Sequence, residues 1–324
     1  MDISVVVPTF NRKEIVKRTL ETLFAQDPSP ASYEVIVVVD GSTDGTLEAL
    51  RALNPSIRLR IIEQENRGPA GARNTGYRAA AADLVLFLDD DMLCDPGLVA
   101  AHIAAHKPSG PIVAFGAIFL SPDSPPSLAA ECFKREIGAL HIKNELGGEA
   151  TWKLTDCVFS NTSLPSRLLE EFGGFDETFR MREDLELGFR LFSAGVRPQY
   201  IKEAIAYQSY NKTDADLIRD AEAFAVGDVM FACKHPEASL WGQLNWLAEQ
   251  PSWKRTLRCL AAIWPPAADF VLVPVCSLGE TFFRIPVFRG IGIRALQMRR
   301  RIHWQHTFTK YDRHLRESES EKTV

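Results

Sequence analysis

Residues 3–88 alternate between short apolar runs and amphipathic segments, and this alternation limits the fold more than any other feature. The apolar runs read as buried strands at residues 3–7, 33–39, 57–63 and 84–88. Helix-like segments at residues 14–25, 43–53 and 71–82 separate them. Strands joined in this way predict an α/β fold with a mostly parallel, Rossmann-like sheet and helices on both faces. Ligands of such sheets bind at the carboxyl ends of the strands.

Three consecutive aspartates, Asp89, Asp90 and Asp91, directly follow the fourth predicted strand. Adjacent like charges repel one another and are costly to desolvate, and a divalent cation relieves both effects. Mg²⁺ and Mn²⁺ prefer carboxylate oxygens together with the phosphates of a substrate. The alternative is a solvated loop that leads into a helix, and the triplet alone does not decide between the two.

The first two strands also end in polar residues. Residues 8–12 follow the first strand, and Asp40 follows the second, at the start of a glycine-containing turn. A carboxylate at a strand end can accept a hydrogen bond from the N–H of a nucleobase. Capping of the next helix by Ser42 or Thr43 is the competing interpretation, and the two roles can coexist.

A glycine-rich loop at residues 66–76 runs into the third predicted helix. Free N–H groups at a helix start bind phosphate, and Arg73 is the charged residue best placed to pair with a diphosphate. A surface arginine is the alternative. Because no G-x-G-x-x-G pattern occurs, a dinucleotide-binding site is not supported.

Glu183 and Asp184 begin an acidic helix, where the helix macrodipole favours carboxylates. Leu187 and Leu191 lie one helical turn apart and would face the core, which leaves the two acids toward a site. A carboxylate held in this way can take the proton of an alcohol as a general base. Salt bridges to neighbouring arginines are the alternative role.

The composition excludes several classes of protein. The net charge of −5 gives no indication of nucleic-acid binding, so we expect no nucleic-acid partner. The six cysteines form no Cys-x-x-Cys pair, which argues against zinc sites and fits a reducing compartment. The N-terminus reads as a core strand rather than a signal peptide. We therefore expect a cytoplasmic protein.

Six motifs, taken in order, resemble those of the family 2 glycosyltransferases, which have the GT-A fold. They are residues 8–12, 38–46, 66–76, 88–91, 173–177 and 183–184. The resemblance covers about residues 1–210. It implies a metal-dependent, inverting transferase that moves a sugar from a nucleotide-diphosphate donor, with a UDP-sugar favoured, to an acceptor hydroxyl. The product would be a polysaccharide, glycolipid or other glycoconjugate.

The resemblance also implies a role for each candidate residue. Asp91, with Asp89, would bind Mn²⁺ or Mg²⁺, and Asp184 would be the catalytic base, with Glu183 orienting the acceptor or that base. Asp40 would contact the donor base. The full set of implied donor-binding residues is Pro8, Thr9, Asn11, Arg12, Asp40, Arg73, Asp89 and Asp90.

The chain departs from the family pattern at two places. Val39 stands where the family often has the first of two aspartates, and residues 206–209 lack the histidine that some members supply as a further metal ligand. A nucleotidyltransferase and a catalytically inactive sugar-nucleotide-binding protein are the competing hypotheses. The first would want a basic, glycine-rich loop at residues 8–12, and the second would fit a loss of Asp91 or Asp184, but both are present.

We expect a GT-A domain at residues 1–212, with a nucleotide-sugar half at about 1–110 and an acceptor half at 111–212. A helical C-terminal region would fill residues 213–324 and carry a basic tail. Eight basic residues and one acid lie between Arg289 and Arg316, next to an apolar stretch whose prolines oppose a membrane span. Contact of residues 257–316 with the inner face of a membrane, which would suit a lipid-linked glycan acceptor, and packing as a subdomain or in a homodimer are both left open.

Overall fold

The computed structural model of the chain describes residues 1–27, 32–107, 110–147, 152–238 and 259–322. The chain divides into two compact units, and the boundaries interleave. The N-terminal unit comprises Met1–Ser124 and Ile137–Tyr210, and the C-terminal unit comprises Pro125–Glu136 and Asn211–Val324.

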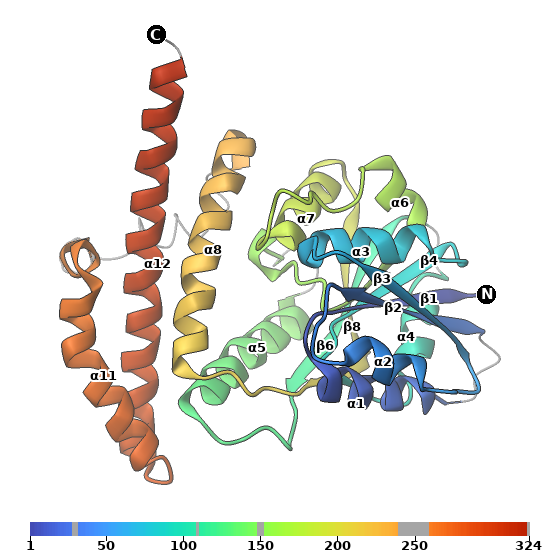
Figure 1. Cartoon of the computed structure of the whole chain (residues 1–324), viewed down its shortest axis with the longest axis horizontal. Coiled ribbons are helices and arrows are strands. Elements are labelled where there is room, and N and C mark those ends of the chain that lie inside the picture. Colours follow the sequence, from blue (N-terminus) through green and yellow to red (C-terminus); the bar gives the residue numbers. More distant parts are fainter. Residues whose placement is uncertain (28–31, 108–109, 148–151, 239–258, 323–324) are drawn as a thin grey trace. The chain divides into compact units, whose positions relative to one another are not determined.

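One eight-stranded mixed sheet forms the centre of the N-terminal unit, with the strand order β3-β2-β1-β4-β7-β6-β8-β5. The first four strands in this order run parallel, whereas β7 is antiparallel to both of its neighbours and β5 is antiparallel to β8. The predicted fold class, a helix-flanked α/β sheet with a helical C-terminal region, is confirmed (Figure 1). The strands are β1 (Ile3–Thr9), β2 (Tyr33–Asp40), β3 (Arg58–Gln64), β4 (Leu84–Leu88), β5 (Met92–Cys94), β6 (Ile112–Leu120), β7 (Asn161–Pro165) and β8 (Arg197–Gln208).

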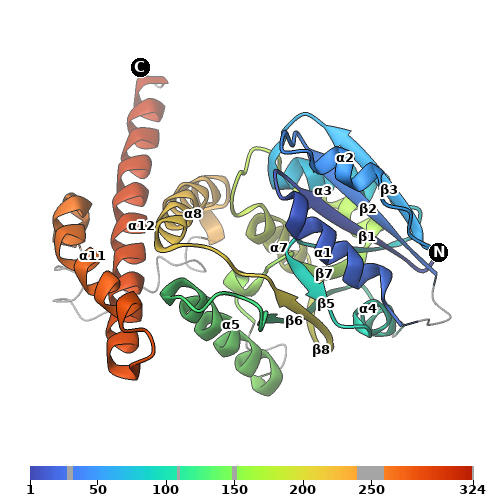
Figure 2. The ribbon, with the colours of Figure 1, turned by 60° about the horizontal axis from the view of Figure 1, so that its bottom comes forward.

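Helices cover both faces of this sheet (Figure 2). Val5 and Val7 of β1 point into an apolar layer shared with α1, α2 and α4, whereas Val6 points into a layer shared with α3, α6 and α7. This division follows from the alternation of side chains along a strand. The helices of the unit are α1 (Lys13–Phe24), α2 (Thr46–Arg51), α3 (Gly68–Arg78), α4 (Leu98–Ala105), α5 (Leu128–Gly147, which begins in the C-terminal unit), α6 (Ser166–Glu171) and α7 (Glu183–Ser193).

Helix α3 lies unusually close to the sheet because of Gly76. A Cβ atom at this position would lie 2.2 Å from Cγ1 of Val6 and 3.3 Å from Cγ2 of Val38. Contacts this short do not occur between real side chains, so only glycine permits the observed approach. The glycine-rich sequence of this segment therefore brings the helix that carries Arg73 onto β1 and β2.

Two helices, α2 and α3, each begin about one helical turn away from the expected residue. Helix α2 begins at Thr46 rather than residue 43, because the Asp44 carboxylate accepts a hydrogen bond from the Thr46 N–H and Gly45 adopts a left-handed φ of 82°. Helix α3 begins at Gly68 rather than residue 71. The Asp40 carboxylate accepts the N–H of Gly68, and a proline follows in the first turn, where its missing N–H costs nothing.

A buried polar network fastens α4 to β7. His102 Nε2 lies 2.9 Å from Asn161 Oδ1, and His102 Nδ1 lies 2.8 Å from Ser163 Oγ. Asn161 uses its amide nitrogen to donate to two backbone carbonyls, so its oxygen accepts from His102 Nε2–H and Nδ1 is left to accept from Ser163. His102 is therefore neutral, and burial lowers its pKa to about 4.

This network gives a pH-dependent contribution to stability. Below pH 6.5 the unfolded chain protonates His102, whereas the folded chain does not until about pH 4, so stability falls as the pH falls through this window. The shift from 6.5 to about 4 corresponds to roughly 3 kcal/mol of unfolding free energy. The raised pKa values of Asp91 and Asp184 increase stability on acidification, so the test compares the wild type with His102→Gln.

Denaturant unfolding at a series of pH values should show that the variant loses less unfolding free energy than the wild type on acidification. Equal losses of unfolding free energy would contradict this interpretation.

In the described part of the C-terminal unit, all regular secondary structure is helical. The unit contains the start of α5 together with α8 (Asp214–Lys234), α11 (Pro265–Thr281) and α12 (Pro286–Lys322). The 3-10 helices among the described residues are Leu154–Asp156 and Pro236–Ala238. Thr213 caps α8 in a capping box with Asp216. Among the helices described, none is both long and apolar enough to cross a membrane.

Candidate active site

The carboxyl ends of β1, β2 and β4 bring the first group of candidate residues to one edge of the sheet. β1 lies between β2 and β4, and all three strands are parallel, so Thr9, Asp40 and the triplet after Leu88 follow neighbouring strand ends. Pro8 lies inside β1, opposite Val38 of β2. The order and direction of the strands alone bring these residues together at the carboxyl ends of the strands, where the sequence predicted them to lie.

Asp90 is turned into the protein and joins the two loops at this edge. Its Oδ2 accepts a hydrogen bond of 2.7 Å from Thr9 Oγ1, and its Oδ1 accepts one of 2.9 Å from Arg12 Nη1. Its backbone carbonyl accepts from Thr19 of α1. The pKa of this buried carboxyl is raised, chiefly by burial. Asp90 thus holds the aspartate triplet against the end of β1.

The negative charge of Asp91 is costly in its surroundings. Burial, and then the charges of Asp89 and Asp90, raise its pKa to about 7. Arg12 Nη1 lies 3.2 Å from Oδ2, and Gln208 Nε2 lies 3.2–3.3 Å from both oxygens. These donors only partly compensate the negative charge, so the environment favours an additional cation.

Gln208 is a site residue that the sequence did not predict. Residues 206–209 contain no histidine, but the antiparallel pairing of Met92 with Gln208 sets the Gln208 amide directly against Asp91. A pairing between residues more than a hundred positions apart has no local signature. No sequence pattern available in one chain could have indicated this contact.

The oxygen ligands at this edge suit a hard divalent cation held in part by substrate. Within the described residues, no three histidine, cysteine or acidic side chains are grouped to hold a metal ion together. Mg²⁺ commonly takes only one or two carboxylates and completes its shell with water and substrate phosphates. Asp91 and Asp89 fit such a site, and a bound cation would replace the donors of Arg12 and Gln208 on Asp91.

Arg73 of α3 connects the aspartate triplet to α7. Its Nη2 donates to Asp89 Oδ1 at 2.9 Å, and its Nη1 donates to Glu183 Oε1 at 2.6 Å. The guanidinium is buried and lies 5.6 Å from the centroid of the Phe175 ring. Its Nε has no hydrogen-bond partner. Arg73 therefore brings together two groups that are 94 residues apart, one from each predicted half of the site.

Glu183 and Asp184 begin α7, after Arg182 turns the chain with a left-handed φ of 75°. Burial, and then the neighbouring Glu183 charge, raise the pKa of Asp184 to about 7, although Arg182 and Arg73 oppose the shift. Glu183 is buried, and its Oε2 has no hydrogen-bond partner. A carboxyl group with a pKa near neutrality has the proton affinity that general-base catalysis requires.

The loop before α7 is held by hydrogen bonds from α3 and from α7 itself. Asn74 of α3 donates to the Phe175 carbonyl and accepts the Phe175 N–H, at 2.8 and 2.9 Å. Arg190 of α7 donates to the Gly174 carbonyl and to the buried Glu186. These bonds hold the segment that leads to Glu183 and Asp184 against α3, next to Arg73.

Asp40 organises the glycine-rich loop. Its Oδ1 accepts from Gln64 Nε2 at 2.7 Å and from the Arg67 N–H at 2.8 Å, and its Oδ2 accepts the Gly68 N–H at 2.9 Å. A carboxylate has about four acceptor positions, so one remains on Oδ2. The competing interpretation, in which Ser42 or Thr43 caps α2, is wrong, because α2 begins after Gly45 without a side-chain cap. Asp40 instead accepts N–H groups at the start of α3.

Asn11 joins the loops that follow β1 and β2. Its backbone N–H donates to Ser42 Oγ at 2.9 Å, and its side-chain oxygen accepts the Thr43 N–H at 2.7 Å. The residue has a φ of 52°, a left-handed value that asparagine tolerates better than most side chains. In this structure Asn11 shapes the edge of the site.

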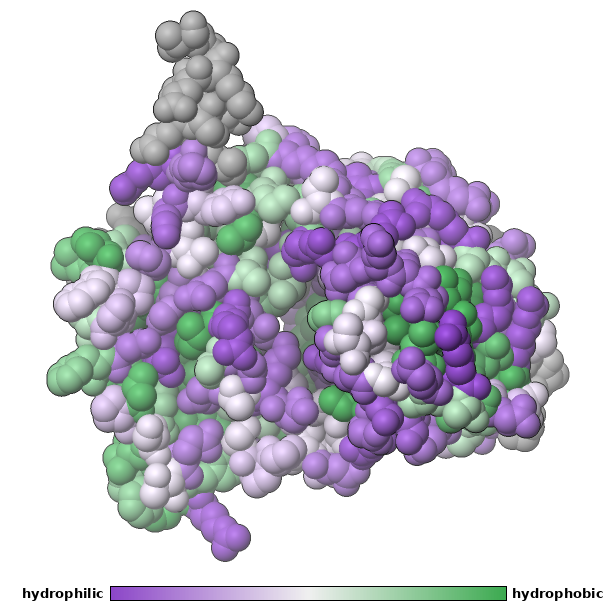
Figure 3. Space-filling model, in the orientation of Figure 1, coloured by the Kyte–Doolittle hydropathy of each residue, from purple (hydrophilic) through white to green (hydrophobic). Residues whose placement is uncertain are grey.

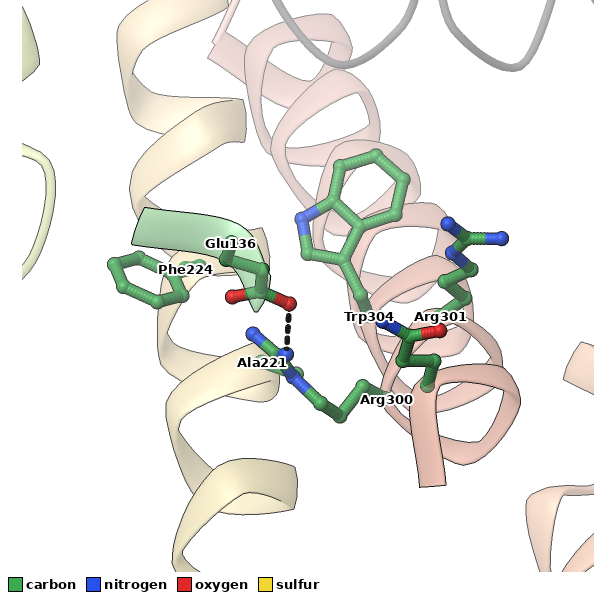
Figure 4. A pocket seen from close by; sticks show the side chains of 7 residues that line it. Glu136, Ala221, Phe224, Arg300, Arg301 and Trp304 are labelled. Atoms are coloured by element: carbon green, nitrogen blue, oxygen red, sulfur yellow. Dashed lines mark hydrogen bonds and ion pairs between the residues drawn. The ribbon is translucent and has the colours of Figure 1, made fainter. Parts of the chain in front are cut away.

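A separate cavity of about 260 Å³ lies within the C-terminal unit (Figure 4). Trp304, Phe224 and Arg301 line it, and Glu136 pairs there with Arg300 at 2.6 Å. None of the predicted site residues lines this cavity, and its one carboxylate is neutralised by the arginine. We therefore assign it no part in the chemistry.

Comparison with known sequences places the N-terminal unit in a family. Residues 4–172, about half of the chain, match the sequence profile of glycosyl transferase family 2. The validoxylamine A glucosyltransferase of Streptomyces hygroscopicus subsp. limoneus is 32% identical over 274 residues, which cover 75% of this chain and 58% of that protein. The pre-mycofactocin glycosyltransferase of Mycobacterium tuberculosis (strain CDC 1551 / Oshkosh) is 27% identical, with 73% of this chain and 48% of that protein covered. This chain spans less than two thirds of the length of these relatives.

Solved structures with the same fold include two glycosyltransferases. The mannosyltransferase PcManGT from Pyrobaculum calidifontis, in complex with GDP-Man and Mn²⁺, aligns with a TM-score of 0.61 at 21% identity, covering 95% of this chain and 88% of that chain. TarS 1–349 of S. aureus, in complex with UDP, aligns with a TM-score of 0.51 at 17% identity, covering 97% and 92%. At these identities the likeness establishes the GT-A fold.

Proposed function

Because this chain belongs to glycosyl transferase family 2, we propose that it is a metal-dependent, inverting glycosyltransferase that uses a nucleotide-diphosphate sugar. The observation that carries the proposal is the pair of bonds from Arg73 to Asp89 and to Glu183. The Arg73 guanidinium therefore links the carboxylates that suit a metal-bound diphosphate to the acidic start of α7. A donor and an acceptor held at these two places would meet between them.

The donor half of the reaction rests on the aspartate triplet. Asp91, with Asp89, would hold Mn²⁺ or Mg²⁺, which when bound supplies positive charge to the departing diphosphate. Arg12 and Arg73 add guanidinium donors, suited to phosphate oxygens, at the same edge. Released from Asp91 or Asp89, either group can turn toward the diphosphate.

The acceptor half rests on α7. The acceptor hydroxyl attacks the anomeric carbon from the side opposite the diphosphate, and Asp184 takes the hydroxyl proton. The new C–O bond forms as the bond to the diphosphate breaks, so the diphosphate leaves with the electron pair and the configuration inverts. Glu183 Oε2 is buried without a hydrogen-bond partner, which supports a role in accepting a hydrogen bond that orients the acceptor.

The test is release of nucleoside diphosphate from a panel of sugar nucleotides, measured with Mn²⁺, with Mg²⁺ and with a chelator. We expect slow metal-dependent hydrolysis of one donor, and faster release when the correct hydroxyl acceptor is added. Release of pyrophosphate from a nucleoside triphosphate and a sugar phosphate would indicate a nucleotidyltransferase instead. Donor binding without any turnover would indicate an inactive binding protein.

The donor base is predicted to carry an imino N–H, with uracil favoured over guanine and thymine. The Asp40 carboxylate only accepts hydrogen bonds, and one acceptor position on its Oδ2 remains after three are filled. Calorimetric titration should show UDP binding at least about tenfold more tightly than CDP or ADP, the value of one hydrogen bond to a charged group. Tighter binding of the cytidine or adenosine compound would refute the assignment of Asp40.

A further inference from the structure

One side of α11 is exposed and almost entirely apolar. Phe270 is 85% exposed and Val271 61%, and Pro274, Leu278 and Phe282 continue the same side of the helix at intervals of three or four residues. This spacing places them along a single stripe. Soluble proteins rarely leave a continuous stripe of large hydrophobic side chains in water, so this one points to an interaction.

A second exposed row lies on α12, after the turn that ends α11. Val287 is 67% exposed, and Ile291, Arg294 and Met298 follow it at helical spacing on the exposed side of α12. Hydrophobic residues are visible on the surface over α11 in Figure 3. We refer to the exposed side of α11 and this first part of α12 as the apolar-basic face.

The charges on the apolar-basic face are all positive. Arg284 and Arg294 are exposed, and in the described part of the chain neither forms an ion pair. The two acids of residues 260–298 are engaged elsewhere, because Asp269 pairs with Arg299 and Glu280 accepts the Leu128 N–H. A surface that suits this face is therefore apolar and negatively charged.

We propose that the apolar-basic face docks onto the surface of a membrane that contains anionic lipid. Exposed Phe270 and Leu278 would enter the acyl boundary, while Arg284 and Arg294 would contact lipid phosphates. Helix α11 has 17 residues and an internal proline, and no described helix is long and apolar enough to cross a membrane, so α11 would lie in the plane of the interface.

A second copy of the chain fits this face less well. A symmetric dimer through the apolar-basic face would set the same surface against itself, so Arg284 and Arg294 of both copies would approach without an exposed acid to pair with. Anionic lipid provides the missing negative charge. This inference does not depend on the proposed glycosyl transfer.

The test is flotation of the full-length protein with vesicles of phosphatidylcholine alone or mixed with phosphatidylglycerol, at low and high salt. We expect binding to the mixed vesicles at low salt and about a tenfold or greater loss for Phe270→Glu. The matched control is Ile142→Glu on α5, an equally drastic change of a side chain that is 58% exposed. This control should float like the wild type.

A charge variant keeps the test decisive if Phe270→Glu does not fold. Arg284→Gln combined with Arg294→Gln should weaken binding to the mixed vesicles by roughly tenfold or more, and Arg167→Gln on α6 is its control. A wild type that stays in the soluble fraction at low salt would overturn the proposal. Equal losses in variants and controls would also overturn it, as would light scattering that shows Phe270→Glu converting a dimer to a monomer without vesicle binding.

Discussion

Asp91→Ala is expected to abolish metal-dependent turnover, with a loss of at least ~10³-fold in kcat. Burial, and then the charges of Asp89 and Asp90, raise the pKa of Asp91 to about 7, so its ionised form favours a bound cation. Asp89 would remain as a single carboxylate, shared with Arg73, and would hold the cation more weakly than the pair does. Calorimetric titration with Mn²⁺ in the presence of UDP should show a parallel loss of metal affinity.

The matched control for this prediction lies at the other end of the same strand. Asp83 is exposed just before β4 begins, whereas Asp91 lies just beyond its carboxyl end. Asp83→Ala should therefore leave both turnover and Mn²⁺ affinity unchanged. Full activity of Asp91→Ala, together with inhibition of the wild type by a chelator, would show that the metal is held by other residues.

The sequence predicted the parallel half of the sheet and its polar edge well, because both depend on local patterns. The apolar runs ending in Thr9, Asp40 and Leu88 are long, are separated by helices and can pair in only a few ways. Once these strands are parallel, their carboxyl ends must meet. The placement of Asp40 and the aspartate triplet therefore required no knowledge of tertiary contacts.

The sequence could not predict the contacts that determine what each charge does. Arg73 read as a surface arginine or a diphosphate ligand, yet it is buried and bonded to Asp89 and Glu183. Residues 206–209 showed only the lack of a histidine ligand, yet antiparallel pairing sets Gln208 on Asp91. Both outcomes depend on the insertion of β7 and β8 into the sheet, a long-range event that residue spacing does not encode.

The boundaries of α2 and α3 illustrate the same limit on a smaller scale. Helical periodicity begins near residues 43 and 71, but carboxylates decide where each helix starts. Asp44 holds a turn before α2, and Asp40 binds the first N–H groups of α3 from a different strand. Side-chain bonds to the backbone compete with the helix in the first case and extend it in the second.

Asp184→Asn is predicted to retain donor and metal binding but to lose transfer by at least ~10²-fold in kcat. The amide is nearly isosteric with the carboxylate but cannot take a proton. Burial and the Glu183 charge raise the pKa of Asp184 to about 7, and the base acts only when ionised. In the wild type kcat/KM should therefore fall as the pH falls below 7, and the residual activity of Asp184→Asn should lack this step.

The measurement that separates this role from a structural one is donor affinity. Glu171→Gln, an exposed carboxylate on α6, should change neither transfer nor binding and serves as the control. If calorimetry showed that Asp184→Asn no longer binds the donor, Asp184 would act in binding rather than as the base. If the pH profile of the variant kept the wild-type step, the titrating group would be another carboxylate. Asp91, whose pKa is also raised to about 7, would then be the first to test.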